Sequence, residues 1–158
     1  MSSTAPSSLV IERAGGDVLD EVMAVMSAAF DRRFGEAWTR AQCAGILPMA
    51  GVSLMLARSD GKAAGFSLAR RTMDEAELLL IAVRPDFARM GIGGQLVERF
   101  IADQRVAGAH HLHLEVRDGN PAVQLYLDHG FTIAGRRGQY YCGTDGEKFD
   151  ALTMVLTV

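Results

Sequence analysis

The chain has 158 residues, a length typical of one domain, and 49% of its residues are hydrophobic and 22% charged. This composition excludes a chain that is disordered along most of its length, because such chains have too few apolar residues to form a core. The formal net charge of −3 provides no positive field to attract a polyanion, so no direct binding to nucleic acid is expected. An enzyme or a protein-binding module remains.

The N-terminal residues and the cysteines are typical of a reduced, cytoplasmic protein. Residues 1–8 carry neither the basic region nor the apolar segment of a signal peptide, and we expect them to form a short disordered lead to one domain over residues 9–158. The longest apolar runs, such as residues 78–83, are far shorter than the roughly 18 to 20 residues of a membrane helix. Cys43 and Cys142 form no CxxC pair, so neither a metal site nor a disulfide framework is predicted.

Two helices are predicted after a first strand at residues 9–11. Apolar residues at helical spacing indicate an amphipathic helix over residues 17–30, with Asp17 as its N-cap. A second helix is predicted over residues 39–46, where Thr39 is placed to cap it.

Three consecutive strands are predicted next, over residues 52–58, 62–71 and 76–83. Residues 59–61, Ser-Asp-Gly, have the composition of a hairpin turn, and Met-Asp-Glu at 73–75 turns the chain again. Strands joined by such short turns form an antiparallel meander.

The second half of the chain begins with a helical crossover. A helix is predicted over residues 95–106, and the alternation of Leu112, Leu114 and Val116 with polar residues indicates a fifth strand, parallel to the fourth. A short helix at 121–129 and strands at 131–137 and 151–156 follow. The predicted class is α+β with one βαβ unit at its centre.

A glycine cluster lies between the fourth strand and the crossover helix. Gly91, Gly93 and Gly94 allow backbone N–H groups to converge on an anion, and the positive end of the helix dipole points to the same place. The segment matches neither GxxxxGK[ST] nor GxGxxG, because Leu96 stands at the third Rossmann glycine and no Lys-Ser/Thr pair follows. The pattern predicts a phosphate cradle of a different kind.

This segment resembles the acetyl-CoA loop of the Gcn5-related N-acetyltransferase (GNAT) superfamily, [QR]-x-x-G-x-[GA]. Both glycines match in Ala88-Arg89-Met90-Gly91-Ile92-Gly93, and Ala88 replaces the usual Gln or Arg. The resemblance implies acetyl-CoA as cosubstrate, with its pyrophosphate on the amides of residues 89–94 and its pantetheine on the fourth strand. The cofactor-binding residues expected in this way are Ile81, Ala82, Val83, Arg89, Met90, Gly91, Ile92, Gly93, Gly94 and Asn120.

A second match covers residues 114–131, which are similar to the family pattern LEVR…N…A..LY…GF. The resemblance implies that Glu115 is the general base and Tyr126 the general acid. Glu77, on the fourth strand, is a rival base. Asn120 precedes Tyr126 by one position fewer than the family's Asn, so Gly119 shares the expected contact. The alternatives are a solvent-facing carboxylate at 115 and a core tyrosine at 126.

The implied fold is the GNAT acyl-CoA N-acyltransferase fold, a twisted, mostly antiparallel sheet of about seven strands whose fourth and fifth strands are parallel, with flanking helices. Residues 136–154 are similar to the end of bacterial ribosomal-protein-alanine N-acetyltransferases, with one extra residue before Tyr140-Tyr141 and Phe149 at an acidic position. The expected function is acetylation of a protein N-terminus, possibly of a ribosomal protein, by a monomer or homodimer. A small amine or lysine as acceptor, or a non-catalytic acyl-CoA-binding module, is the alternative.

Overall fold

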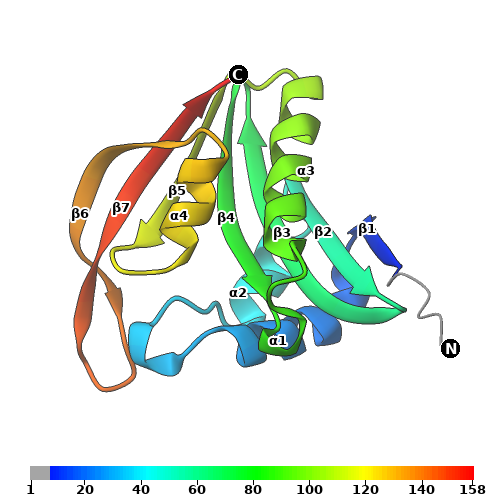
Figure 1. The fold of residues 1–158 in the computed structure, drawn as a ribbon, viewed down its shortest axis with the longest axis horizontal. Helices are drawn as coiled ribbons and strands as arrows, with labels where there is room; N and C mark the ends of the chain where they lie inside the picture. The colour runs from blue at the N-terminus through cyan, green and yellow to red at the C-terminus, as the bar shows by residue number, and fades with distance from the viewer. Residues whose placement is uncertain (1–7) are drawn as a thin grey trace, which may run out of the picture.

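The computed structural model describes residues 8–158, which form one seven-stranded sheet in the order β1-β2-β3-β4-β5-β7-β6 (Figure 1). Neighbouring strands are antiparallel except for β4 and β5, which are parallel. The strands are β1 (Leu9–Ala14), β2 (Val52–Ser59), β3 (Lys62–Thr72), β4 (Glu75–Val83), β5 (His111–Arg117), β6 (Thr132–Cys142) and β7 (Lys148–Thr157). The helices are α1 (Leu19–Ala29), α2 (Arg40–Ile46), α3 (Ile92–Val106) and α4 (Ala122–Asp128). The predicted strand count and the parallel central pair are confirmed.

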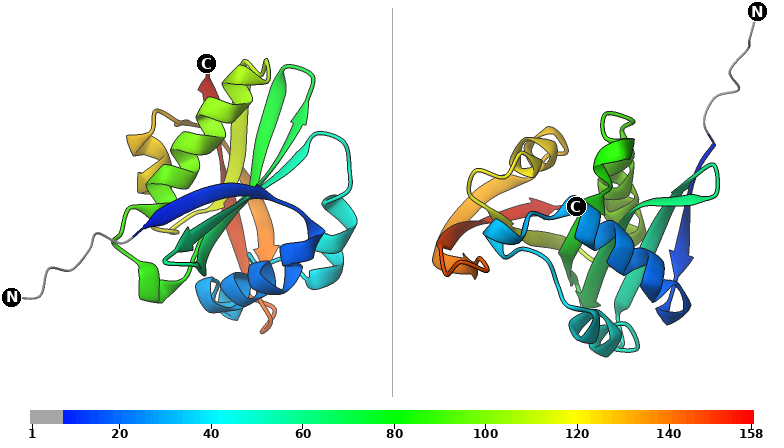
Figure 2. Two further views of the ribbon diagram at one scale, coloured as in Figure 1. Left: turned by 90° about the vertical axis from the view of Figure 1, so that its right-hand side faces the viewer. Right: turned by 90° about the horizontal axis from the view of Figure 1, so that it is seen from below.

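The helices cover the two faces of the sheet in pairs, with α1 and α2 on one face and α3 and α4 on the other (Figure 2). No helix within residues 8–158 is long and apolar enough to cross a membrane. The expected disordered lead lies outside the described residues except for Ser8, whose N–H donates to Asp60 Oδ1 at 3.1 Å.

The helix starts differ from the sequence predictions at α1 and agree at α2. Residues 16–18 form a 3₁₀ turn and α1 begins at Leu19, with no side-chain cap, so Asp17 is not the N-cap. At α2, Thr39 Oγ1 accepts from Gln42 N–H at 3.2 Å, and Gln42 Oε1 accepts from Thr39 N–H at 2.8 Å. These two hydrogen bonds form a reciprocal capping box, so the prediction that Thr39 caps this helix is confirmed.

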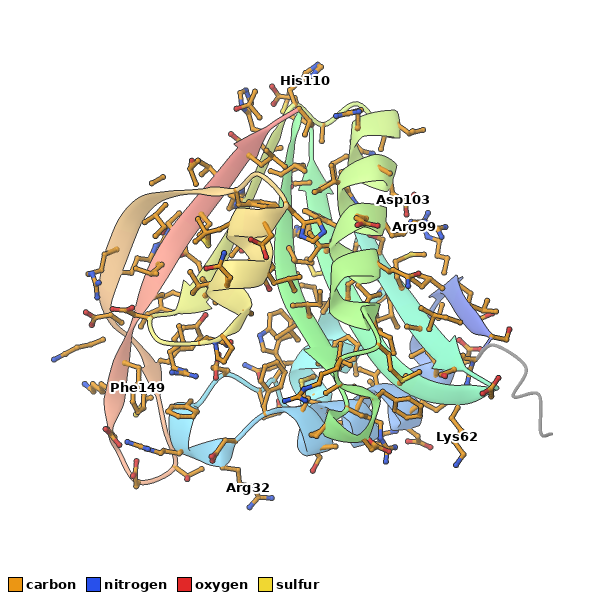
Figure 3. The ribbon with its side chains drawn as sticks, viewed as in Figure 1. Arg32, Lys62, Arg99, Asp103, His110 and Phe149 are labelled. Carbon is orange, nitrogen blue, oxygen red and sulfur yellow. The ribbon has the colours of Figure 1, made fainter. Side chains whose placement is uncertain are left out.

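The last two strands form a hairpin that is longer than the sequence pattern predicted. In β6 every residue but Tyr141 is exposed, so no alternation of buried and exposed positions marks its length. The hairpin reaches back to the turn before α2, where the Phe149 and Phe34 rings meet edge to face with centroids 5.2 Å apart (Figure 3). The hairpin and the α1–α2 connection therefore meet at one side of the molecule.

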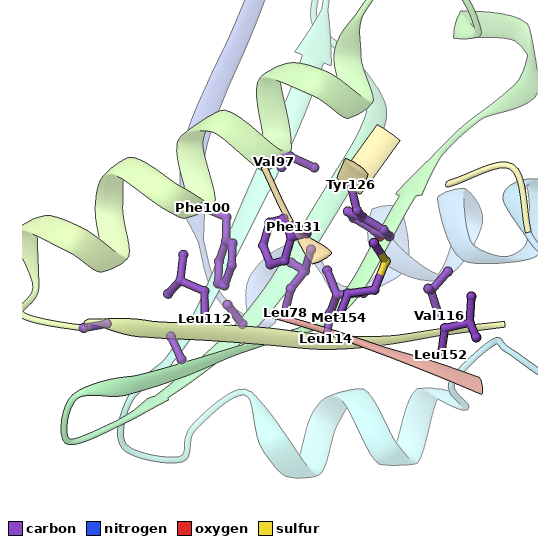
Figure 4. Packing of buried hydrophobic residues seen from close by; sticks show 13 residues of the cluster. Leu78, Val97, Phe100, Leu112, Leu114, Val116, Tyr126, Phe131, Leu152 and Met154 are labelled. Carbon is purple, nitrogen blue, oxygen red and sulfur yellow. The ribbon is translucent and has the colours of Figure 1, made fainter. Parts of the chain in front are cut away.

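A core cluster holds α3 and α4 against β4, β5 and β7 (Figure 4). Phe100 from α3 and Leu112 and Leu114 from β5 are at most 2% exposed, as the predicted alternation in β5 requires. Tyr126 from α4 and Phe131 join the same cluster, with ring centroids 6.0 Å apart. This packing fixes α4 over the centre of the sheet.

Candidate active site

The parallel strands β4 and β5 separate partway along their length. Their paired register runs from Glu75 and His111 to Leu78 and Leu114, although β4 continues to Val83 and β5 to Arg117. A cavity of about 110 Å³ opens where the pairing ends. The polar and aromatic side chains that line it are those of Phe30, Glu36, Trp38, Glu77, Glu115, Asn120, Tyr126, Tyr140 and Tyr141.

The end of β4 forms one wall of this cavity. Ile81, Ala82 and Val83 pair with β3 on one side, and no β5 residue pairs with them on the other. The β4 edge that faces β5 therefore keeps main-chain groups free for another extended chain. Ala82 is 5% exposed and packs toward α1, so its side chain is not available to a ligand and only its backbone is.

The glycine segment begins with two left-handed residues. Arg89 has φ +65° and Gly91, the N-cap of α3, has φ +74°. A Cβ built on Gly91 meets no protein atom within 4 Å, so the space beside it is open. Met90 between them is 43% exposed. This bend turns the chain from β4 into α3 with its backbone accessible.

The helix α3 starts three residues earlier than predicted, so Gly93 and Gly94 belong to its first turn rather than to a loop. First-turn N–H groups have no acceptor inside a helix, which makes those of Ile92, Gly93 and Gly94 free donors. The Ile92 side chain is 2% exposed and lies in the core, so only its backbone can reach a ligand. A Cβ on Gly93 would lie 3.3 Å from Leu125 Cδ2, so this glycine also permits close packing of α3 on α4.

Glu115 projects from β5 into the cavity and is held at both carboxylate oxygens. Oε2 accepts from Thr153 Oγ1 at 2.7 Å, and Oε1 lies 3.2 Å from Arg137 Nε. The Glu115 side chain is only 10% exposed. It is thus a fixed, mostly buried carboxylate, unlike the solvent-facing strand residue that the alternative required.

Tyr126 lines the same cavity from α4 while its ring packs in the core. Its hydroxyl has no hydrogen-bond partner within residues 8–158, and no fully buried side-chain oxygen or nitrogen of this part of the chain lacks a partner. The hydroxyl therefore faces the cavity. Burial, and to a lesser extent the neighbouring Tyr141 and Glu36, raises the pKa of Tyr126 above its ordinary value, so the hydroxyl keeps its proton at neutral pH.

The rival carboxylate, Glu77, also reaches this cavity. Its Oε2 lies 3.2 Å from His113 Nε2, and both side chains are about one third exposed. Glu77 and Glu115 therefore differ in partners and in exposure but share one cavity.

The sequence analysis did not identify Glu36. It expected Asn120 to contact the cofactor and did not predict that Asn120 is hydrogen-bonded to Glu36. Glu36 Oε1 lies 3.1 Å from Arg117 Nε, with both side chains 10% exposed, and Asn120 Nδ2 donates to Glu36 Oε2 at 2.7 Å. Asn120 Oδ1 also accepts from Ala122 N–H at 2.8 Å, at the start of α4. The Arg117 guanidinium carbon lies 3.6 Å from the Phe34 ring centroid. No local pattern could have found Glu36, because its partners lie more than 80 positions along the chain.

Two adjacent tyrosines on β6, for which the sequence analysis predicted no functional role, line the cavity. Tyr140 and Tyr141 meet edge to face with centroids 4.9 Å apart, and Tyr141 Oη donates to the Glu115 backbone oxygen at 3.3 Å. Burial raises the pKa of Tyr141, with Tyr140 and the nearby carboxylates of Glu36 and Glu115 adding to the effect and Arg117 opposing it. Both hydroxyls therefore remain neutral donors near physiological pH.

Comparison with known proteins agrees with this geometry. Residues 19–131 match the acetyltransferase (GNAT) family. Over 100 residues the chain is 42% identical to the [ribosomal protein bS18]-alanine N-acetyltransferase of Escherichia coli K12, which covers 63% of this chain and 67% of the relative.

Solved structures share the whole fold. The crystal structure of the ribosomal-protein-S18-alanine N-acetyltransferase from Escherichia coli superposes with a TM-score of 0.85 at 31% identity, covering 96% of this chain and 94% of the other. That of Ard1 from Thermoplasma volcanium gives 0.82 at 27% identity, covering 95% and 97%. The split parallel pair, the open helix N-terminus and these matches lead to one conclusion: the chain belongs to the acetyltransferase (GNAT) family and is an N-acetyltransferase.

Proposed function

We propose that this protein transfers the acetyl group of acetyl-CoA to the N-terminal α-amine of a protein, with the terminal alanine of ribosomal protein bS18 as the first candidate. The observation that carries the proposal is the cavity that opens where β4 and β5 separate, lined by Glu115 and Tyr126 beside a free strand edge. The name of the 42% identical relative supports the choice of acceptor.

The chain's own residues fit a CoA thioester. The free N–H groups at the start of α3 suit a pyrophosphate, because unpaired donors and the helix dipole both favour an anion there. The open space beside Gly91 leaves room for it. The unpaired edge of β4, with Ile81 and Val83, can hydrogen-bond the amides of a pantetheine arm. When bound, acetyl-CoA supplies an activated acyl group at the cavity.

Glu115 is the proposed general base. An attacking amine must be neutral, and at pH 7 neutralising an α-amine costs roughly 1 kcal/mol, against roughly 4 to 5 kcal/mol for lysine. One fixed carboxylate, acting directly or through water, is adequate for the smaller cost. The Thr153 and Arg137 contacts hold Glu115 in one orientation, which suits a group that must meet an incoming amine.

Tyr126 is the proposed general acid. Its proton is retained at neutral pH because burial raises its pKa, and its hydroxyl faces the cavity. It can therefore donate to a departing thiolate. The core packing of the ring fixes the position of this donor.

The test is an acetyl-CoA turnover screen with matched acceptors. One peptide begins with a free alanine and carries an internal lysine, a second is the same peptide with its α-amine blocked, and a third acceptor is a free small amine. We expect turnover of the first alone. Equal turnover of the blocked peptide would assign the enzyme to lysine, and turnover of the small amine alone would replace the protein acceptor.

A further inference from the structure

A second, larger cavity lies on the α3 face of the sheet. Its volume is about 520 Å³, within the range of small-molecule sites, and none of its lining residues lines the cavity between β4 and β5. It is bounded by β1, β2, β3 and the C-terminal half of α3. Arg99 and Asp103 project from α3 on the side where β1 and β2 lie (Figure 3). The acetyl-transfer proposal gives this cavity no role.

The lining of this second cavity is positively charged. Arg13 from β1 and Arg71 from β3 form no ion pair with any carboxylate in the part of the chain that the structure describes, and Arg71 Nη1 donates only to the Met73 carbonyl at 3.2 Å. Arg99 is matched by Asp103, with Nε and Oδ2 2.9 Å apart. Two guanidinium charges therefore remain in excess. The C-terminal end of the α3 helix dipole offsets these two positive charges by only about half a negative charge.

The Gln104 side chain provides a second, independent observation that points to a ligand in this cavity. Gln104 is 6% exposed and lines the cavity, yet its carboxamide makes no hydrogen bond with any residue from 8 to 158. Because no fully buried polar side-chain atom in this range is unsatisfied, the amide must face the cavity. The polar end of an otherwise buried side chain is thus open to the cavity and has no partner in the protein, so it is available to a bound group.

We propose that this cavity binds a small ligand bearing oxyanion groups, either carboxylates or phosphates. Arg13 and Arg71 would pair with its oxygens, since the planar guanidinium fork matches both groups, and the Gln104 amide would donate a further hydrogen bond. The proposal does not depend on the acetyl-transfer reaction, because no residue is shared between the two cavities.

Calorimetric titration of the full chain with citrate, and separately with inorganic phosphate, tests this proposal at constant ionic strength. We expect saturable binding of at least one probe. Arg13→Gln and Arg71→Gln should each weaken it about tenfold or more, since a charge-assisted hydrogen bond is lost. Binding of citrate alone would identify a polycarboxylate ligand, and binding of phosphate alone a phosphate-bearing one.

Arg70→Gln is the matched control. Arg70 precedes Arg71 on β3 but lines a different cavity, with His113 and Glu77 on the opposite face of the sheet. The control loses the same charge, and binding should be retained. Gln104→Leu should weaken binding several-fold with no change of net charge. Circular dichroism verifies that each variant is folded. The proposal is overturned if neither probe binds saturably, or if Arg70→Gln weakens binding as much as Arg71→Gln.

Discussion

The two sides of the cavity between β4 and β5 are built from different parts of the chain. The proposed CoA side consists of main-chain groups within residues 81–94, a strand end followed directly by a helix start. The proposed acceptor side consists of side chains that meet across long sequence separations, such as Glu36 with Arg117 and Glu115 with Thr153. One side depends on backbone conformation, and the other on tertiary packing.

This difference has consequences for substitution. Backbone donors tolerate many side chains, so we expect the proposed CoA site to tolerate Ala88, which stands where the family usually has Gln or Arg. The side-chain network is less tolerant, because removing one member leaves a mostly buried partner without its hydrogen bond or counter-charge. We therefore expect substitutions on the acceptor side to alter catalysis or stability, and those on the CoA side to alter cofactor affinity.

The largest effect is expected for Glu115→Gln, which keeps size but cannot accept a proton. kcat/KM at pH 7 should fall by roughly 10² to 10⁴, the range for losing a general base. The deficit should shrink with rising pH as free amine becomes plentiful, near pH 8 for an α-amine and nearer pH 10 for a lysine. Glu77→Gln is the matched control, measured over the same pH series. A larger loss for Glu77→Gln would transfer the role to that residue.

Tyr126→Phe removes one hydroxyl without opening a cavity in the core. Turnover should fall by roughly 10- to 10³-fold in kcat, while the folded structure persists. Tyr140→Phe removes a hydroxyl from the same cavity at a half-exposed position and should have a much smaller effect. Should Tyr126→Phe alter only thermal stability, the core-tyrosine interpretation would replace the general acid.

The same comparison explains what the sequence could predict. Element order, the parallel pair and the glycine bend follow from local patterns, since alternation in β5 and the Gly91 turn involve neighbouring residues. The capping residue Thr39 was equally local. Glu115 and Tyr126 were found through family resemblance, because nothing in their own spacing shows that they face one cavity.

The errors also have physical causes. Asp17 is a good capping residue by type, but residues 16–18 form a 3₁₀ turn and the helix begins after it. Gly93 and Gly94 were expected in a loop because glycine weakens helices, and contact with α4 explains why a small residue stands at position 93 of this helix: a Cβ on Gly93 would lie 3.3 Å from Leu125 Cδ2. The sequence around Glu36 indicated no functional role for this residue, because its contacts in the site are with Arg117 and Asn120, which are distant along the chain.

Arg117→Met tests the acceptor-side network directly. The substitution keeps volume but leaves the Glu36 carboxylate mostly buried without its counter-charge, at a cost of about 3 kcal/mol in the free energy of unfolding. The double variant with Glu36→Gln should recover most of this loss, because no unpaired charge remains. Urea denaturation measures both. An additive double variant would show that the two side chains do not interact.

Gly91→Ala tests the CoA side. At φ +74° a side chain adds strain of about 1 to 2 kcal/mol and places a methyl group in the open space beside α3. Calorimetry should show CoA binding weakened about tenfold. Gly61→Ala is the matched control, because Gly61 has φ +83° and equally open space but lies in the β2–β3 turn. It should lose similar stability and bind CoA normally; equal loss of CoA binding in both variants would mean that strain alone is responsible.

The smallest effect concerns alkaline pH and the buried tyrosines. Because burial raises the pKa of Tyr126 and Tyr141, each contributes stability that is complete below the unfolded-state value of about 10 and is lost as pH rises above it. In that range the unfolded chain releases the tyrosine proton while the folded protein retains it. The free energy of unfolding should fall by about 1.4 kcal/mol per pH unit for each such tyrosine.

Urea titrations between about pH 9 and pH 11 measure this decline. The free energy of unfolding should fall less steeply for Tyr126→Phe than for the wild type, and the difference should equal the contribution of one tyrosine. An unchanged decline would mean that Tyr126 ionises within the folded protein. Its hydroxyl would then be better hydrated than its place in the core indicates, and a more exposed member of the cavity, such as Tyr140, would be the better candidate for the acid.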